Sequence, residues 1–266
     1  MAKQILTREN YFSQEMNKRY CGSSQFKAFM ECPHSAYAEM VGDYERPKGK
    51  ALLMGSLFDA MFEGTVEEFS KANPELFNSR KPGELKADYK MVEEIYQRVS
   101  RDDVWMKAAT GEQQVIFTGF IRDVPFKIAV DSMHPDRIVD RKLMKDFKGD
   151  WKNGRKLPWW QVYGYDIQAA IYREIVRQNI GEILPFEIAA ATKEKNSETG
   201  KIKTDFGLFR FTDSELSDAL KYVEENVEDI QRMKEGILPL WRCDDCEYCR
   251  ETKILTGYQL FEACDI

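Results

Sequence analysis

The stretch AVDSMHPDRIVDRKL, residues 129–143, places two carboxylates and a lysine on two adjacent predicted strands. The segments 124–131 and 137–143 are rich in Val and Ile and alternate with polar residues, and His-Pro-Asp marks the turn between them. Asp140 and Lys142 are two residues apart, so the strand period puts their side chains on one face of the sheet, opposite to Val139 and Arg141. We therefore expect Asp131, Asp140 and Lys142 to converge.

Such a group of side chains suits a divalent metal. Two carboxylates completed by water are typical ligands of Mg²⁺. The ion polarises a phosphodiester and acidifies a water molecule. A lysine beside it orients that water or stabilises charge that develops on the phosphate. The residues alone leave a second interpretation open, in which the hairpin lies on the surface and its charges are solvated.

Helices and strands are predicted on both sides of this hairpin. We expect helices at 23–41 (ended or kinked at Pro33), 51–64, 85–109 (one helix or two), 158–179 and 214–234, and further strands at 114–121, 188–192 and 207–211, with loops at 46–50 and 65–83. This order predicts one α/β domain over 1–266, with a central mixed sheet flanked by helices. Its parts are an N-terminal arm (1–22), a helical layer (23–110), a catalytic core (111–240) and a cysteine-containing segment (241–266).

Composition narrows the function classes. The 266 residues carry a net charge of −6, which argues against a wholly basic nucleic-acid-binding surface but allows a local basic groove. No apolar run is long enough for a membrane span, and no secretory signal is visible near the start, so we expect a cytoplasmic protein without a membrane partner. With two histidines, a multi-histidine metal site is excluded.

Asp131 followed by IVDRK (138–142) resembles the D…(D/E)-x-K signature of the PD-(D/E)XK nuclease superfamily, whose core is the restriction-endonuclease-like fold. Further blocks are similar to the RecE-like and RecB-like exonuclease branch and follow its order. They are SSQFKAFMECPHSAY (23–37), ALLMGSLFDAMFEG (51–64), GEQQVIFTGFIRDVPFKIAVD (111–131) and YGYDIQAAIYRE (163–174).

The resemblance implies a role for each matching residue. Asp131 and Asp140 would bind Mg²⁺, for which Mn²⁺ can substitute, and Lys142 would be the catalytic lysine. Asp59 would replace a metal-binding histidine, and Glu112 is a weaker candidate for an additional acidic ligand. Gln168 and Tyr172 would support the site or contact DNA. Each of the last four residues also has a purely structural interpretation.

The implied activity is exonucleolytic hydrolysis of linear duplex DNA from 5′ to 3′. The product would be a 3′ single-stranded tail for phage-type recombination with a RecT-like annealing protein, in a bacterial or phage-infected cell. Exonucleases of this group are often homo-oligomeric rings. Two alternatives remain: a RecB-like or CRISPR-associated-type nuclease that acts on single strands and holds an iron–sulfur cluster, and an inactive DNA-binding module on the same fold.

The segment KDFKGDWKNGRKLPWW (145–160) combines basic residues with tryptophans, which suits contact with phosphates and unpaired bases. Its candidate DNA contacts are Lys145, Lys148, Arg155 and Lys156. The alternative is a solvated loop whose tryptophans belong to the core of the next helix.

Three cysteines form CDDCEYC (243–249), a spacing typical of ligands for Zn²⁺ or an iron–sulfur cluster. Cys32 is a candidate fourth ligand to join Cys243, Cys246 and Cys249. In nucleases of the AddB type, which the arrangement resembles, one N-terminal and three C-terminal cysteines hold an iron–sulfur cluster, although the last spacing differs here. The alternative is a metal-free segment with reduced thiols.

Overall fold

A computed structural model describes residues 5–152, 154–255 and 257–258, so the ends of the predicted arm and of the cysteine-containing segment lie outside the described residues. The helices are α1 (Gln14–Arg19), α2 (Ser23–Glu31), α3 (Pro33–Val41), α4 (Lys50–Glu63), α5 (Val66–Ala72), α6 (Ala87–Val99), α7 (Asp103–Ala109), α8 (Trp159–Val162), α9 (Tyr165–Ile180), α10 (Asp213–Lys234) and α11 (Glu247–Glu251). The strands are β1 (Phe77–Asn78), β2 (Lys81–Leu85), β3 (Glu112–Ile121), β4 (Val124–Met133), β5 (Ile138–Met144), β6 (Asp150–Lys152), β7 (Arg155–Leu157), β8 (Phe186–Thr192) and β9 (Phe206–Arg210). A short 3-10 turn covers Pro74–Leu76.

Within the described residues, five strands form a mixed sheet in the order β3-β4-β5-β8-β9. The pair β5 and β8 is parallel, and the other neighbours are antiparallel. A parallel pair requires a crossover, which here runs through the β6–β7 hairpin, α8 and α9. The predicted α/β class with a central mixed sheet flanked by helices is confirmed.

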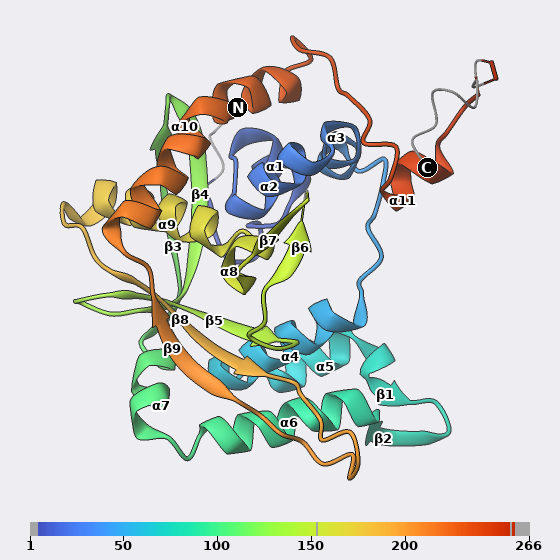
Figure 1. Cartoon of the computed structure of the whole chain (residues 1–266), viewed down its shortest axis with the longest axis vertical. Coiled ribbons are helices and arrows are strands. Elements are labelled where there is room, and N and C mark those ends of the chain that lie inside the picture. Colours follow the sequence, from blue (N-terminus) through green and yellow to red (C-terminus); the bar gives the residue numbers. More distant parts are fainter. Residues whose placement is uncertain (1–4, 153, 256, 259–266) are drawn as a thin grey trace.

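Helices cover both faces of this sheet (Figure 1). One face, with Phe126, Ile128 and Ile188, packs against α2, α9 and α10. The other face, with Val139 and Ala189, packs against α4, α6 and α7. Successive residues of β5 and β8 alternate between the two cores, as the strand period requires. Both faces of the strands that carry the predicted site are therefore fixed by packing.

Two predicted helices are broken. The expected helix 23–41 is two helices, because Pro33 lacks an N–H and begins α3 after the extended Cys32. The expected helix 158–179 is interrupted at Gly164, whose φ of +62° is left-handed and ends α8 before α9 begins.

Two predicted loops contain regular structure. The segment 65–83 holds α5, β1 and most of β2, and the basic segment 145–160 holds the β6–β7 hairpin, which turns at Gly154 with φ of +73°. The 85–109 segment is a pair of helices, and the other predicted helices and strands agree with the structure to within a few residues. The short helices α1 and α11 were not predicted. Among the described residues, we find no helix with the length and apolar character that a bilayer crossing requires.

Candidate active site

The central feature of the site is a fork between β4 and β5. These strands pair at Ser132 with Val139 and at Met133 with Ile138, and the same register would next pair Asp131 with Asp140. The ladder stops there: the Asp131 carboxylate Oδ2 instead accepts a hydrogen bond of 3.0 Å from the backbone N–H of Arg141. The strands therefore separate where the two predicted metal ligands stand, and both residues line one pocket.

Strand β3 also has an irregular backbone conformation, at Gln114, which lies opposite Asp131. The two-residue turn Arg122-Asp123, with positive φ at both residues, sets a register that places Gln114 opposite Asp131. Gln114 has a φ of +54°, which is uncommon for a residue with a side chain. Its amide Nε2 donates to Asp131 Oδ1 at 3.1 Å and to Glu63 Oε1 at 2.7 Å. Unusual backbone conformations of this kind concentrate at functional sites.

Asp140 is buried and has two close partners. Lys142 Nζ lies 2.6 Å from Asp140 Oδ2, and Gln168 Nε2 on α9 donates to Oδ1 at 2.7 Å. Burial raises the pKa of Asp140 to about 6; Lys142 opposes the rise and Asp131 adds to it. Burial alone would lower the pKa of Lys142, but the Asp140 and Asp131 carboxylates outweigh that effect and raise it. Lys142 is therefore a permanent cation at neutral pH.

The predicted metal ligand Asp59 enters from α4 and meets Arg141. Its Oδ1 accepts from Arg141 Nε at 3.1 Å, and the Arg141 side chain is fully buried. Arg141 Nη2 also lies 3.7 Å from Glu63 Oε1, one helical turn beyond Asp59. Burial, followed by the Asp131 charge, raises the pKa of Asp59 to about 8, and Arg141 limits the rise. Asp59 keeps 35% of its side chain exposed and lines the same pocket as Asp131.

The pocket has a volume of about 830 Å³ and brings six predicted residues together. They are Asp59, Asp131, Asp140, Lys142, Gln168 and Tyr172. Burial, with the Asp131 charge as a smaller cause, raises the pKa values of two of its carboxyl groups, and a bound cation would stabilise their ionised forms. Asp140 Oδ2 is also buried, and the Lys142 ammonium lies 2.6 Å from it. A hard divalent cation prefers carboxylate oxygens of this kind, so the donor set fits Mg²⁺ or Mn²⁺.

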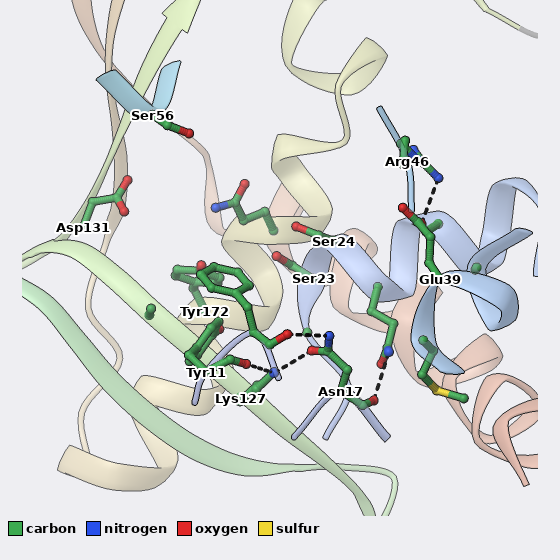
Figure 2. A pocket seen from close by; sticks show the side chains of 18 of the residues that line it. Tyr11, Asn17, Ser23, Ser24, Glu39, Arg46, Ser56, Lys127, Asp131 and Tyr172 are labelled. Atoms are coloured by element: carbon green, nitrogen blue, oxygen red, sulfur yellow. Dashed lines mark hydrogen bonds and ion pairs between the residues drawn. The ribbon is translucent and has the colours of Figure 1, made fainter. Parts of the chain in front are cut away.

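The opposite wall comes from the N-terminal part of the chain. Figure 2 shows Ser23 and Ser24 of α2 and Glu39 of α3 on that wall, with Tyr11 lying close to Tyr172. Lys127 of β4, which is buried, fastens this wall to the sheet, because its Nζ donates to the Tyr11 carbonyl and, at 2.8 Å, to Asn17 Oδ1. The site therefore lies between the sheet and the N-terminal helices.

Some predicted residues lie elsewhere. Glu112 is exposed on β3 opposite Met133 and does not line the pocket. Gln114, two residues later, is the β3 residue that lines the pocket beside Asp131. The candidate DNA contacts Lys145, Lys148, Arg155 and Lys156 are all exposed on or beside the β6–β7 hairpin, outside the pocket lining. Trp151 on that hairpin is 70% exposed, whereas Trp159 is buried in the core.

The prediction missed four residues that contact or surround the carboxylates: Glu63, Gln114, Lys127 and Arg141 as a partner of Asp59. Two of them had a signal in the sequence. Glu63 is four residues after Asp59 and so on the same helix face. Gln114 follows from counting back through the two-residue turn at Arg122-Asp123 to the residue opposite Asp131.

The four predicted cysteine ligands also come together, away from the carboxylates. The Sγ atoms of Cys32, Cys243, Cys246 and Cys249 all lie within 4.8 Å of one another, an arrangement that is able to hold a metal.

Comparisons with known proteins agree with this geometry. The sequence profile of one family, described as "PDDEXK-like domain of unknown function (DUF3799)", matches residues 22–252. A crystal structure of a protein from Eubacterium rectale, described as a candidate exonuclease, is similar with a TM-score of 0.90 and 41% sequence identity. The similarity covers 97% of each chain. No curated protein sequence gives a significant match.

Proposed function

Because this chain belongs to the PDDEXK-like domain family, within the PD-(D/E)XK nuclease superfamily, we propose that it is a Mg²⁺-dependent DNA exonuclease that degrades linear duplexes from 5′ to 3′. Family and structural similarity support a nuclease. The observation that carries the proposed metal dependence is the fork at which Asp131 and Asp140 face one pocket with Lys142 beside them. The proposed duplex substrate and 5′ to 3′ polarity rest on the resemblance to RecE-type enzymes.

Each side chain has a distinct part in the proposed reaction. Asp131 and Asp140, with Asp59 as a third donor, would hold the metal, which supplies positive charge to polarise the scissile phosphodiester. Lys142 stays charged and lies 2.6 Å from Asp140, where its ammonium is placed to orient the attacking water and stabilise charge on the phosphate. Gln168 fixes the Asp140 carboxylate through its 2.7 Å hydrogen bond. Tyr172 is buried beside it at the edge of the pocket.

The proposed DNA contacts extend beyond the pocket. The exposed cations of the β6–β7 hairpin, Lys148, Arg155 and Lys156, together with Lys145, suit the phosphate backbone, and exposed Trp151 offers a surface on which a base can stack. The hairpin is joined to α2 by the ion pair between Lys152 and Glu31 at 3.2 Å. It is therefore held near the helices that form the pocket wall.

The biological setting is part of the same proposal. The resemblance to RecE-type enzymes supports a role in phage-type recombination, in which a RecT-like annealing protein takes up the 3′ tail. It also supports action on duplex ends by a ring of subunits in the cytoplasm of a bacterial or phage-infected cell.

The test is digestion of a linear duplex that carries a label at the 5′ or the 3′ end, with Mg²⁺, Mn²⁺ or EDTA. We expect metal-dependent release of the 5′ label as mononucleotides. Lys142→Ala should lower the rate by about 100-fold or more. The matched control is Lys221→Ala, because Lys221 lies on α10 with 74% of its side chain exposed and should leave the rate unchanged.

Three outcomes would contradict parts of the proposal. Release from the 3′ end, or cleavage of single strands only, would keep the nuclease site and reject the polarity or the duplex substrate. A folded sample that binds Mg²⁺ and duplex ends but cleaves neither substrate would favour an inactive binding module. Equal activity of the Lys142 and Lys221 variants would reject the site.

A further inference from the structure

Four cysteines from distant parts of the chain meet where α11 contacts α3. Figure 1 shows these two helices as neighbours, although one is near the start of the chain and the other near its end. Cys32 stands at the junction of α2 and α3, and the other three belong to the segment around α11. Cys32 Sγ is 3.5 Å from Cys249 Sγ and 3.9 Å from Cys246 Sγ, and Cys243 completes the group. All four are free thiols rather than disulfide partners.

The backbone of the segment directs its sulfurs to one point. The N–H of Cys246 donates to Cys243 Sγ at 3.3 Å, and the N–H of Cys249 donates to Cys246 Sγ at 3.5 Å. Asp244, with a φ of +58°, allows the first of these two tight turns. A neutral thiol is a weak acceptor, whereas a charged acceptor forms a stronger bond. The repeated N–H···S contact therefore suits thiolate ligands.

We propose that these four thiolates bind one Zn²⁺ ion in a tetrahedral structural site. A Zn–S bond of about 2.3 Å places tetrahedral ligand sulfurs about 3.8 Å apart. The distances from Cys32 Sγ to Cys249 Sγ and Cys246 Sγ, 3.5 and 3.9 Å, lie on either side of this value, and every pair is within 4.8 Å.

The same spacing does not fit the iron–sulfur cluster that the sequence resemblance implied. In a cubane cluster each cysteine binds a different iron, so the iron and sulfide core separates the ligand sulfurs more widely than a single ion does. Sulfurs that all lie within 4.8 Å leave no room for such a core without a shift of α3 or of the segment. The geometry therefore favours a mononuclear site.

A bound metal would attach the segment 241–251 to the rest of the protein, to which few other contacts hold it. Within the described stretch 241–251, Cys249 is the one buried side chain, so apolar burial contributes little to its attachment. Further contacts to α3 and its end include a hydrogen bond of 3.3 Å from the His34 N–H to the Trp241 carbonyl and the Tyr248 ring against His34 and Tyr44. Metal binding would thus supply most of the free energy that holds this segment in place.

The cysteine site lies next to the helices that form one wall of the pocket. Cys32 joins the two helices whose residues Ser24 and Glu39 line the pocket wall. A metal there would brace α2 against α3 from outside. The inference concerns structure and does not depend on the proposed nuclease activity.

The experiment measures metal content, absorbance and thiol reactivity of the full-length protein purified without chelators. We expect about one zinc per chain, no absorbance band at about 400 nm, and slow reaction of four thiols until zinc is removed. Removal of zinc should also speed cleavage of the chain near residues 241–258 by a protease.

Two variants keep the proposal falsifiable. Cys246→Ser should lower zinc to less than about a tenth of the wild-type content. Cys21→Ala, which removes a buried cysteine outside the group, should keep it. Iron with absorbance at about 400 nm, a Cys32–Cys249 disulfide, or four reactive thiols without any metal would each overturn the proposal. Equal zinc loss in both variants would overturn it as well.

Discussion

Gln168 offers a sharp test of how the site is tuned. Its amide Nε2 donates to the buried Asp140 carboxylate at 2.7 Å. In Gln168→Met the side chain keeps its length but loses the donor, so the charged form of Asp140 is stabilised less. A hydrogen bond to a charged group contributes about 1.5–3 kcal/mol. At 1.36 kcal/mol per pKa unit this raises the pKa of Asp140 by about 1–2 units.

The expected effect is a pH-dependent loss of metal affinity. The pKa of Asp140 is about 6 in the wild type, so nearly all of the carboxylate is ionised at pH 7. At a pKa of about 7–8, between half and a tenth of the variant would be ionised at that pH, and apparent Mg²⁺ affinity would fall about 2- to 10-fold. At pH 9 both proteins are ionised, so the difference should nearly disappear.

Calorimetric titration with Mg²⁺ between pH 6 and pH 9 measures this shift directly. The control is Gln161→Met on α8, where the glutamine is exposed and does not line the pocket. A loss of affinity that stays constant up to pH 9 would show that Gln168 acts on geometry rather than on the ionisation of Asp140. No loss at pH 7 would refute the reasoning.

Three further predictions follow from the site and its surroundings. Asp131→Asn should abolish Mg²⁺ binding in calorimetry without unfolding the protein, and tight Mg²⁺ binding by the variant would remove Asp131 from the ligand set. Replacing Lys148, Arg155 and Lys156 by Gln should weaken duplex binding and reduce the salt dependence of binding by about one unit of slope per lost phosphate contact, measured between 50 and 200 mM salt; an unchanged slope would place DNA elsewhere. Arg141→Met leaves two carboxylates without their buried cation and should lower the free energy of unfolding by about 3–5 kcal/mol at pH 9, where Asp59 is ionised, in urea denaturation. Because the pKa of Asp59 is about 8, this loss should be smaller at pH 6, where Asp59 is protonated and carries no charge, and a loss that is independent of pH would argue against unpaired charge as the cause.

Local patterns in the sequence were sufficient to predict that Asp131, Asp140 and Lys142 lie close together. Alternation within β5 predicted that Asp140 and Lys142 share a face while Val139 and Arg141 point away, and the two cores confirm this for Val139 and Ile138. The break at Pro33 was predicted and is confirmed, whereas the break at Gly164 was not predicted. Only the φ of Gly164 shows that α8 ends there, since a glycine is compatible with either conformation until packing selects one.

The partners of the carboxylates show where local reasoning ends. Arg141 was expected on the face of β5 opposite to Asp140, and on that face its guanidinium contacts Asp59 and Glu63 of α4, a helix about 80 residues earlier in the chain. No period within β5 or α4 contains that contact, because it arises only when α4 packs on the face that carries Arg141. Once it forms, the backbone N–H of Arg141 holds Asp131 while its side chain holds Asp59. Arg141 of β5, between the two signature positions, thus couples carboxylates of α4 and β4, and the pKa of Asp59 and the position of Asp131 should respond together to any change at Arg141.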